Sequence, residues 1–504
     1  MRKAGILLPI FSLPSNYGIG SLGKEAYNFV DFLVRTGQSV WQILPLTSTN
    51  QEDFYSPYKT NGAFSGNYDF IDIELLVQEN LLAQKFLDSV NIENTNINAR
   101  YINYEEVRKL KKIFFKEAFR NFKDNKLKEE KEFKDFEKKN TFWLNEFCSF
   151  MALKEINDFL PFLEWKKIKD LKELKNSKDK KLEKKYYDIF LYHKFLQFLF
   201  YKQWFNLKKY ANDRGIQIFG DIPMYVSDDS SDFYFHREIF LTNDKGEPSS
   251  VAGVPPDDFS SEGQCWGNPL YDWKYLKEKG FYWWIKRIKK SLELYDILRI
   301  DHFRAFESCY SIDKNSRNAK EGIWLKVPGK EFFKLLKKEL PNANIVAEDL
   351  GIITDEVRDL LNYTNYPGMK VIQFGFNSDS SNKNLPYNFY KNTVAYTGTH
   401  DNATLAEWLL TSPHNVFEYA RQYLRLDTYN KYTEGLIRSV ISSCSDLAII
   451  PIQDWLDFGA WARINTPSTT SFNWKFRLLK EDLTTDLETY IAYICGLYGR
   501  YVKK

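Results

Sequence analysis

Three acidic residues each stand directly after an apolar run in the sequence. Asp301 ends the run Ile-Leu-Arg-Ile-Asp, Glu348 follows Ile-Val-Ala, and Asp401 closes the run that begins at Thr393. Two carboxylates are the minimum for chemistry at a glycosidic bond, because one must be ionised to attack the sugar carbon while the other is protonated to release the leaving oxygen. A third can hydrogen-bond sugar hydroxyls whose charge grows in the transition state. The three residue types therefore suit glycosyl chemistry, provided that the fold brings them together.

The neighbours of these carboxylates predict different protonation states. Arg299 and Arg304 flank Asp301 and should keep its carboxylate charged. Glu348 follows an apolar stretch and stands beside Asp349, a setting that tends to raise a carboxyl pKa. A nucleophile and a general acid require such a separation of their pKa values. The alternative interpretation is three unrelated salt bridges at strand ends.

The apolar runs that carry these residues belong to a set of eight predicted strands. Because catalytic groups in a (β/α)8 barrel sit where the strands end, polar groups at the carboxyl ends of so many strands predict a TIM barrel. A doubly wound sheet is the alternative, but it would concentrate its polar groups at one switch point. The predicted strands are Ala4–Ile10, Ser39–Leu46, Ile216–Asp221, Ile297–Asp301, Asn344–Asp349, Met369–Phe374, Thr393–Asp401 and Leu447–Asp454.

The segments between these strands differ in composition. A helix is predicted over Lys24–Arg35, with Gly37 closing it as a C-cap. We expect a single catalytic barrel domain over residues 1–504, in which residues 74–210 form an inserted, mainly helical subdomain after the second strand. Residues 224–290 are expected to form a lid and insertion region, with a lid loop between the third and fourth strands.

Composition excludes several classes of function. The net charge of +3 over 504 residues does not call for a nucleic-acid partner. No stretch approaches the ~20 apolar residues that a membrane span needs. The five cysteines are scattered and odd in number, which predicts free thiols in a reducing compartment, the cytoplasm. No Gly-rich phosphate motif follows a strand and no His/Cys ligand cluster is present, so no metal or organic cofactor is expected.

Several ordered motifs resemble those of 4-α-glucanotransferases of the amylomaltase, or disproportionating enzyme, type (glycoside hydrolase family 77). The resemblance covers nearly the whole chain apart from the Lys-rich insertion, and several long motifs in the same order make it specific. The matching motifs are Ser56-Pro57-Tyr58, Gly220-Asp221-Ile-Pro223, Gly253-Val-Pro255-Pro256-Asp257, Gln264-Cys-Trp266-Gly267-Asn268-Pro269, Arg299-Ile-Asp301-His302-Phe-Arg304, Ala347-Glu348-Asp349, Thr399-His400-Asp401-Asn402, Ala462-Arg463-Ile-Asn465 and Asn473-Trp474.

The resemblance implies a role for each matching position. Asp301 would be the nucleophile, Glu348 the general acid and then the base, and Asp401 the residue that stabilises the transition state through sugar hydroxyls. The loop from Pro255 to Pro269 would fold over the barrel mouth. The remaining implied substrate-binding residues are Tyr58, Asp221, Trp266, Asn268, Arg299, Asp349, His400 and Asn465.

The function implied is the transfer of an α-1,4-glucan segment to the 4-hydroxyl of glucose or a maltodextrin, by a retaining mechanism through a covalent glycosyl-enzyme. Retention requires the carboxyls of Asp301 and Glu348 to lie about 5–5.5 Å apart. An α-glucan hydrolase of the amylase type is the alternative enzyme, and a glucan-binding protein without catalytic activity would not need all three carboxylates. The sequence leaves the oligomeric state and the preferred chain length open.

Overall fold

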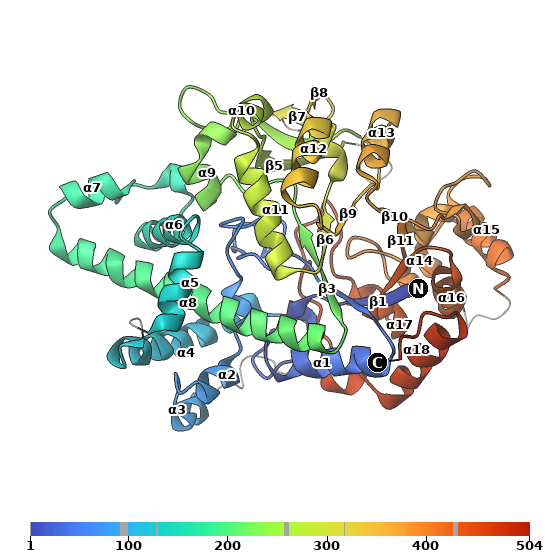
Figure 1. The fold of residues 1–504 in the computed structure, drawn as a ribbon, viewed down its shortest axis with the longest axis horizontal. Helices are drawn as coiled ribbons and strands as arrows, with labels where there is room; N and C mark the ends of the chain where they lie inside the picture. The colour runs from blue at the N-terminus through green and yellow to red at the C-terminus, as the bar shows by residue number, and fades with distance from the viewer. Residues whose placement is uncertain are drawn as a thin grey trace.

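Eight parallel strands form a nearly closed barrel at the centre of the computed structural model, which describes residues 2–90, 99–127, 130–256, 262–316, 318–426 and 432–503 (Figure 1). The strands are hydrogen-bonded in the order β10-β11-β12-β1-β2-β3-β6-β9. At the seam between the two end strands, the Ala347 N–H donates to the Pro367 carbonyl at 2.9 Å. The strands are β1 (Lys3–Leu7), β2 (Val40–Gln42), β3 (Gln217–Ile222), β6 (Ile297–Ile300), β9 (Ile345–Ala347), β10 (Gly368–Val371), β11 (Thr393–Tyr396) and β12 (Leu447–Pro451).

The predicted TIM barrel is confirmed, and its eight strands are the eight apolar runs read from the sequence. Most are shorter than predicted, because the polar residues at their carboxyl ends lie in the loops beyond the ladder. Asp221 is different, since it lies within β3. One buried cluster draws residues from every barrel strand and fills the interior: Leu7, Val40, Phe219, Ile297, Val346, Met369, Val371, Val394, Tyr396, Leu447 and Ile449.

The helix α1 (Lys24–Arg35) has the predicted bounds. Its apolar residues recur at helical spacing and are buried, and Gly37 follows it with φ of +69°, a conformation that suits a glycine after a helix. Further helices surround the barrel: α11 (Tyr282–Leu294), α12 (Gly329–Glu339), α13 (Asp355–Thr364), α14 (Leu405–Thr411), α15 (His414–Leu424), α16 (Tyr432–Ser442), α17 (Ile452–Trp455) and α18 (Thr485–Leu497).

Among the described residues, seven α-helices lie between β2 and β3, and they project to one side of the barrel (Figure 1). Buried residues of this region, such as Phe114, Phe150 and Phe200, belong to the same hydrophobic cluster as Ile6 of β1. The helical region therefore shares its core with the barrel. Its helices are α2 (Ile73–Gln78), α3 (Gln84–Ser89), α4 (Tyr104–Asp124), α5 (Lys131–Lys139), α6 (Leu144–Ile156), α7 (Leu171–Asn176) and α8 (Lys180–Asp213). Its description as an inserted subdomain stays a prediction.

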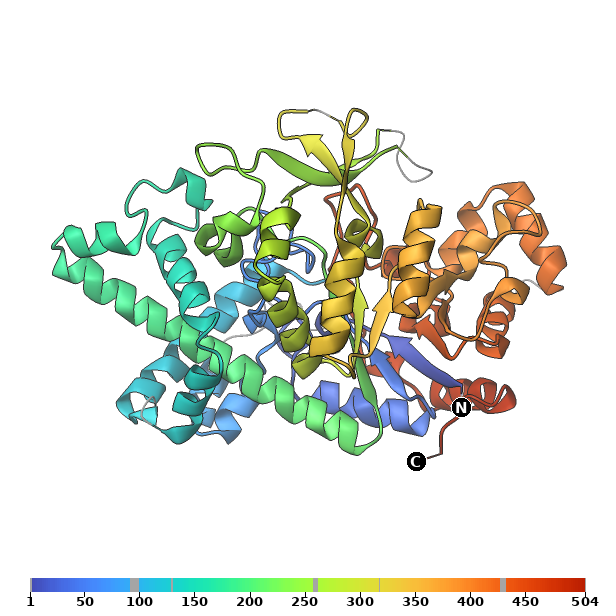
Figure 2. The same cartoon turned by 45° about the horizontal axis from the view of Figure 1, so that its top comes forward.

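A second sheet, antiparallel and of four strands, stands above the barrel (Figure 2). Its order is β5-β4-β7-β8, so strands that follow β3 pair with strands that follow β6. The prediction of a lid loop is therefore wrong in part, because residues 264–269 form a strand. Asp257 lies outside the described residues. The segments here are α9 (Ser231–Phe235), β4 (Ser250–Val254), β5 (Gln264–Pro269), α10 (Trp273–Glu278), β7 (Ser308–Asp313) and β8 (Ile323–Lys326).

No described helix has the length and apolar character needed to cross a membrane.

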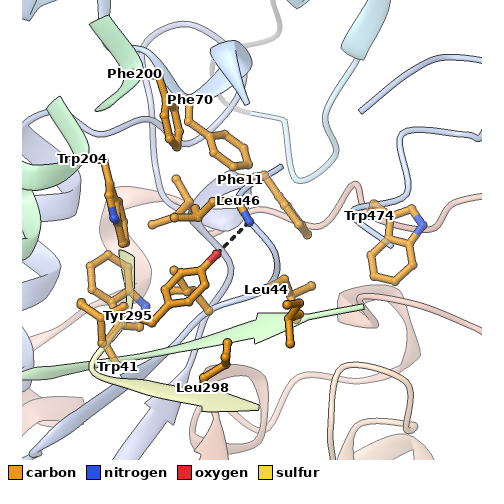
Figure 3. Packing of buried hydrophobic residues seen from close by; sticks show 14 of the residues in the cluster. Phe11, Trp41, Leu44, Leu46, Phe70, Phe200, Trp204, Tyr295, Leu298 and Trp474 are labelled. Carbon is orange, nitrogen blue, oxygen red and sulfur yellow. Dashed lines mark hydrogen bonds between the residues drawn. The ribbon is translucent and has the colours of Figure 1, made fainter. Parts of the chain in front are cut away.

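Aromatic packing fixes the position of β3 relative to the helical region. Tyr295 is buried beside Trp204 of α8, and its hydroxyl accepts a hydrogen bond from the Leu46 N–H at 3.3 Å (Figure 3). The Tyr295 ring lies against Gly220, where an added Cβ would come within 2.1 Å of the ring. Gly220 therefore allows this packing one residue before Asp221.

We predict that Gly220→Ala lowers the free energy of unfolding by about 1–3 kcal/mol, because the new methyl group forces the Tyr295 ring or β3 to move. Urea denaturation measures this loss. Gly496→Ala is the matched control, because nothing but the Tyr501 Cβ, at 4.0 Å, would contact its new methyl group. Equal stability of the Gly220→Ala variant and the unsubstituted protein would contradict the packing described here.

Candidate active site

Arg299 lies inside the barrel between two carboxylates. Its guanidinium nitrogens are 2.6 Å from Asp221 Oδ2 and 2.8 Å from Asp301 Oδ1. Asp221 stands opposite Arg299 in the register of β3 and β6, and residues paired in this way project to the same side of a sheet. The side chains of Arg299 and Asp221 are 4% and 1% exposed, so this ion pair is shielded from water.

The pKa of the Asp301 carboxyl is raised. Burial is the largest cause, and the charges of Asp221 and Asp401 add to it, while the charge of Arg299 acts in the opposite direction. The expectation that Arg304 also holds this carboxylate is wrong. The Arg304 guanidinium lies 3.8 Å from the centre of the Trp324 ring and donates to the Ile352 carbonyl. His302 adopts a left-handed φ of +51°, and the turn that follows it carries Arg304 away.

Glu348 is held by backbone amides. The N–H groups of His302 and Leu350 donate to its two carboxylate oxygens, each at 2.7 Å. Burial raises the pKa of Glu348, and the nearby Asp301 charge raises it further, while Arg299 and the two amides partly offset these effects. A carboxyl whose pKa is raised toward neutrality can donate a proton and later recover one. The predicted raised pKa of Glu348 therefore has a physical cause in the fold.

Asp401 occupies the most strongly ionising setting of the three. Asn465 donates to Asp401 Oδ1 at 2.6 Å, and His400 Nε2 lies 3.1 Å from Oδ2. Burial would raise the pKa of this carboxyl, but the charge and hydrogen bond of His400, together with the Asn465 amide, lower it to about 2. Arg463 also donates to the Asp401 backbone carbonyl at 3.0 Å. Asp401 is therefore an ionised acceptor at neutral pH.

Tyr58 connects the two sides of the site. Its hydroxyl donates to Asp221 Oδ2 at 2.7 Å, and its ring stacks on His400 with the centroids 5.1 Å apart. Trp474 packs beside both rings, at 5.7 Å from Tyr58 and 6.0 Å from His400. Tyr58 thus links Asp221, which pairs with Arg299 beside Asp301, to His400 beside Asp401.

Trp266 and Asn268, both on β5, are placed differently from each other. The half-buried Trp266 ring meets His302 edge-on at 4.9 Å, next to the amide that binds Glu348. Asn268 is buried, and its amide donates to the Val226 carbonyl at 2.8 Å. Trp266 therefore lies at the site, whereas the Asn268 amide fastens β5 to the segment that follows β3.

Asp349 lies at the seam of the barrel. Its Oδ1 accepts a hydrogen bond from the Met369 N–H at 2.6 Å, and burial raises the pKa of the carboxyl to about 6. A Cβ on Gly368 would come within 2.6 Å of this carboxylate. Asp349 thus bonds β9 to β10 directly after Glu348, and its side chain accepts from the Met369 backbone at this seam.

Two side chains at the site, Arg463 and Trp474, were not among the predicted site residues. Both belong to motifs that resemble the family, Ala462-Arg463-Ile-Asn465 and Asn473-Trp474. Arg463 donates to the Asp401 carbonyl, and Trp474 packs against Tyr58 and His400. The motifs could have pointed to both positions, but the sequence does not show what either side chain contacts.

Comparison with known proteins decides the family. A family model described as 4-alpha-glucanotransferase matches residues 8–483. The chain belongs to this family. A 4-alpha-glucanotransferase of Clostridium butyricum is 44% identical over 493 residues, which are 97% of this chain and 99% of the relative, and one of Aquifex aeolicus is 42% identical over the full length of both chains.

The fold comparison agrees with the sequence comparison. The structure of an amylomaltase from Streptococcus agalactiae in complex with acarbose superposes with a TM-score of 0.93 at 38% identity, covering 99% of this chain and 100% of that one. The protein is therefore a 4-alpha-glucanotransferase, an enzyme that transfers segments of α-1,4-glucan. The resemblance read from its motifs is confirmed.

We predict that Arg299→Met moves the acidic limb of the pH–activity profile to higher pH. Without the guanidinium, the pKa of Asp301 rises, so a higher pH is needed to ionise this carboxylate. The unpaired Asp221 should also cost about 3–5 kcal/mol of stability. Glucose release from maltotriose across a pH series, with thermal unfolding in parallel, measures both effects.

Arg287→Met is the matched control, since Arg287 is equally buried and donates to the Met224 carbonyl. It should lower stability and leave the acidic limb in place. An unshifted limb in Arg299→Met would show that this arginine does not set the ionisation of Asp301.

Proposed function

We propose that the enzyme transfers glucan segments by a retaining double displacement in which Asp301 and Glu348 are the catalytic pair. The observation that carries this proposal is the different setting of two neighbouring carboxyls, Asp301 and Glu348. Asp301 forms an ion pair with Arg299, which favours its ionised form, whereas Glu348 is bound by neutral amides in a desolvated position. These settings suit a nucleophile and a general acid.

In the first step, an Asp301 oxygen attacks the anomeric carbon while Glu348 gives its proton to the glycosidic oxygen. The bond from the anomeric carbon to the leaving oxygen breaks, the shortened glucan departs, and the donor segment remains as an ester on Asp301. In the second step, the acceptor 4-hydroxyl attacks the same carbon and gives its proton to Glu348. The new α-1,4 bond forms and the Asp301 carboxylate is released.

Asp401 is proposed to bind hydroxyls of the donor sugar at the cleavage point. Its depressed pKa keeps it ionised, and a charged acceptor gains most from hydroxyls that become more acidic as positive charge develops on the ring. Tyr58 and His400 offer a stacked aromatic wall beside it, which suits the apolar face of a glucose unit. Maltooligosaccharide donors and glucose or maltodextrin acceptors are the proposed partners; the acarbose complex of the Streptococcus agalactiae amylomaltase supports this class.

Residues 224–290 are proposed to act as a lid, and residues 74–210 as an inserted helical subdomain. Trp266 on β5 packs against His302, whose amide binds Glu348, so the second sheet contacts the proposed acid–base residue indirectly. Transfer to sugar instead of water requires an acceptor held close and water kept away during the life of the intermediate. Trp266 is the residue proposed to do both.

A cytoplasmic location is proposed from the thiols. Cys148, Cys265, Cys309, Cys444 and Cys495 are all free, and Cys265 and Cys444 are exposed. Exposed free thiols persist in a reducing compartment.

Incubation with maltotriose alone tests the proposed reaction. Glucose together with longer maltodextrins, at a constant number of reducing ends, is the expected result for transfer. Reducing ends that increase without longer chains would instead indicate a hydrolase. An unchanged substrate would contradict maltotriose as a donor.

Asp301→Asn should reduce turnover of maltotriose by several orders of magnitude, because an amide cannot form the ester intermediate. Binding of maltooligosaccharides, measured by calorimetry, should stay within a few-fold. Asp244→Asn, at an exposed turn, provides the same chemical change away from the site. Full activity in Asp301→Asn would exclude this residue as the nucleophile.

Trp266→Ala should raise the KM for acceptor glucose by roughly fivefold and increase the hydrolysed share of the donor, because a stacking surface worth ~1 kcal/mol is lost and water gains access. The ratio of new reducing ends to transferred chains measures the change. Trp324→Ala is the matched control from the other edge of the same sheet, where the ring packs against Arg304. Equal ratios in the two variants would remove Trp266 from the proposed role.

A further inference from the structure

One buried carboxylate joins both ends of the loop that carries His400 and Asp401. Asp454 Oδ2 accepts a hydrogen bond from the Thr397 hydroxyl at 2.5 Å, and Oδ1 accepts one from the Leu405 N–H at 2.8 Å. Thr397 is the first residue after β11, and Leu405 is the first residue of α14. Both ends of the loop between them are therefore hydrogen-bonded to the same side chain.

We propose that Asp454 is a positioning residue that sets the direction of His400 and Asp401, a role that rests on the proposed function of Asp401. A hydrogen bond at each end of an eight-residue loop limits how far its middle can move. Asp401 in the middle must meet sugar hydroxyls at hydrogen-bond distance, so small displacements of the loop change the stabilisation it provides.

The burial of this group supports the proposal. Asp454 is 3% exposed, and Thr397 and Leu405 are fully buried. Burial raises the pKa of the Asp454 carboxyl to about 7, because its two hydrogen bonds offset only part of the lost hydration. A buried carboxyl is costly, and an apolar side chain would fill the same space at less cost. Asp454 is therefore better explained by the two hydrogen bonds it accepts than by packing.

Packing between this loop and the segment after β12 is incomplete, which increases the dependence of the loop on hydrogen bonds. A small pocket, with room for about one water molecule, lies between this loop and the segment after β12. Its lining includes Thr399, His400, Asp454 and Arg463. A close-packed core would fix the loop by contact alone, whereas a loop over a pocket needs directional bonds.

The middle of the loop is bonded to the same part of the chain. The Asn465 N–H donates to the His400 carbonyl at 3.1 Å, and Arg463 donates to the Asp401 carbonyl. Asp454, Arg463 and Asn465 all follow β12, so this segment holds the loop at its two ends and at its middle. Gln373 adds a further bond, to the Ala403 carbonyl at 2.9 Å.

Thr397→Val tests the proposal, because valine has the shape of threonine and lacks the hydroxyl that binds Asp454. The expected result is a fall in kcat on maltotriose of about ten- to a hundredfold, with KM changed by less than about threefold, since Asp401 acts mainly in the transition state. Thr397→Ser keeps the hydroxyl and should restore most of the activity. Thermal unfolding must show each variant folded at the assay temperature.

A double-mutant cycle with Asp401→Asn separates positioning from a general structural effect. If Thr397 and Asp454 act through Asp401, adding Thr397→Val to Asp401→Asn causes no further loss of kcat. The same fractional loss in both backgrounds would overturn the proposal, as would an unchanged kcat in Thr397→Val. Wild-type kcat in Asp401→Asn alone would instead refute the proposed function of Asp401.

Substitution of Asp454 itself gives an independent result. Asparagine can accept from the Leu405 N–H through its oxygen and donate to the Thr397 hydroxyl through its amide, so Asp454→Asn should keep kcat within about threefold. Asp454→Ala loses both bonds and should lose at least as much activity as Thr397→Val. Retention of full activity by a folded Asp454→Ala variant would overturn the proposal.

Discussion

The buried ion pair of Arg299 with two carboxylates is the interaction on which the site depends. Opposite charges offset the cost of burying a guanidinium inside the barrel, and Asp221 and Asp301 provide these charges from β3 and from the end of β6. Asp221 also accepts a hydrogen bond from Tyr58, and Tyr58 stacks on His400 beside Asp401. The pairing of β3 with β6 is thus linked, through Arg299, Asp221, Tyr58 and His400, to the side of the site that carries Asp401.

The three carboxyls of the site differ because the fold surrounds them differently. Asp301 contacts a cation, Glu348 contacts two backbone amides, and Asp401 contacts His400 and Asn465. Burial raises the pKa of each carboxyl, but at Asp401 the charge and hydrogen bond of His400 and the Asn465 amide outweigh it. A glucan transferase needs an ionised nucleophile and a protonated acid at the same pH; the ion pair with Arg299 favours the ionised form of Asp301, and burial favours the protonated form of Glu348.

The second sheet couples two parts of the barrel that are separate in sequence. β4 and β5 follow the strand that carries Asp221, while β7 and β8 follow the strand that delivers Asp301. Their antiparallel pairing holds Trp266 against His302, and the His302 amide binds Glu348. His302 has a left-handed backbone, its amide donates to Glu348, and two residues later the Arg304 guanidinium lies over the Trp324 ring of β8.

The sequence by itself determined the barrel, its eight strands, the helix α1 and the family. Parallel strands covered on both faces read as short apolar runs, and polar residues at their carboxyl ends mark the mouth where side chains meet. It did not determine the strand β5, whose Gly267, Asn268 and Pro269 are typical of a loop. Only the tertiary structure places Arg304 away from Asp301, bonds Asp349 to β10, and bonds Asp454 to both ends of the loop that carries Asp401. The partners in these contacts lie from 20 to 57 residues apart, so only the folded barrel brings them together.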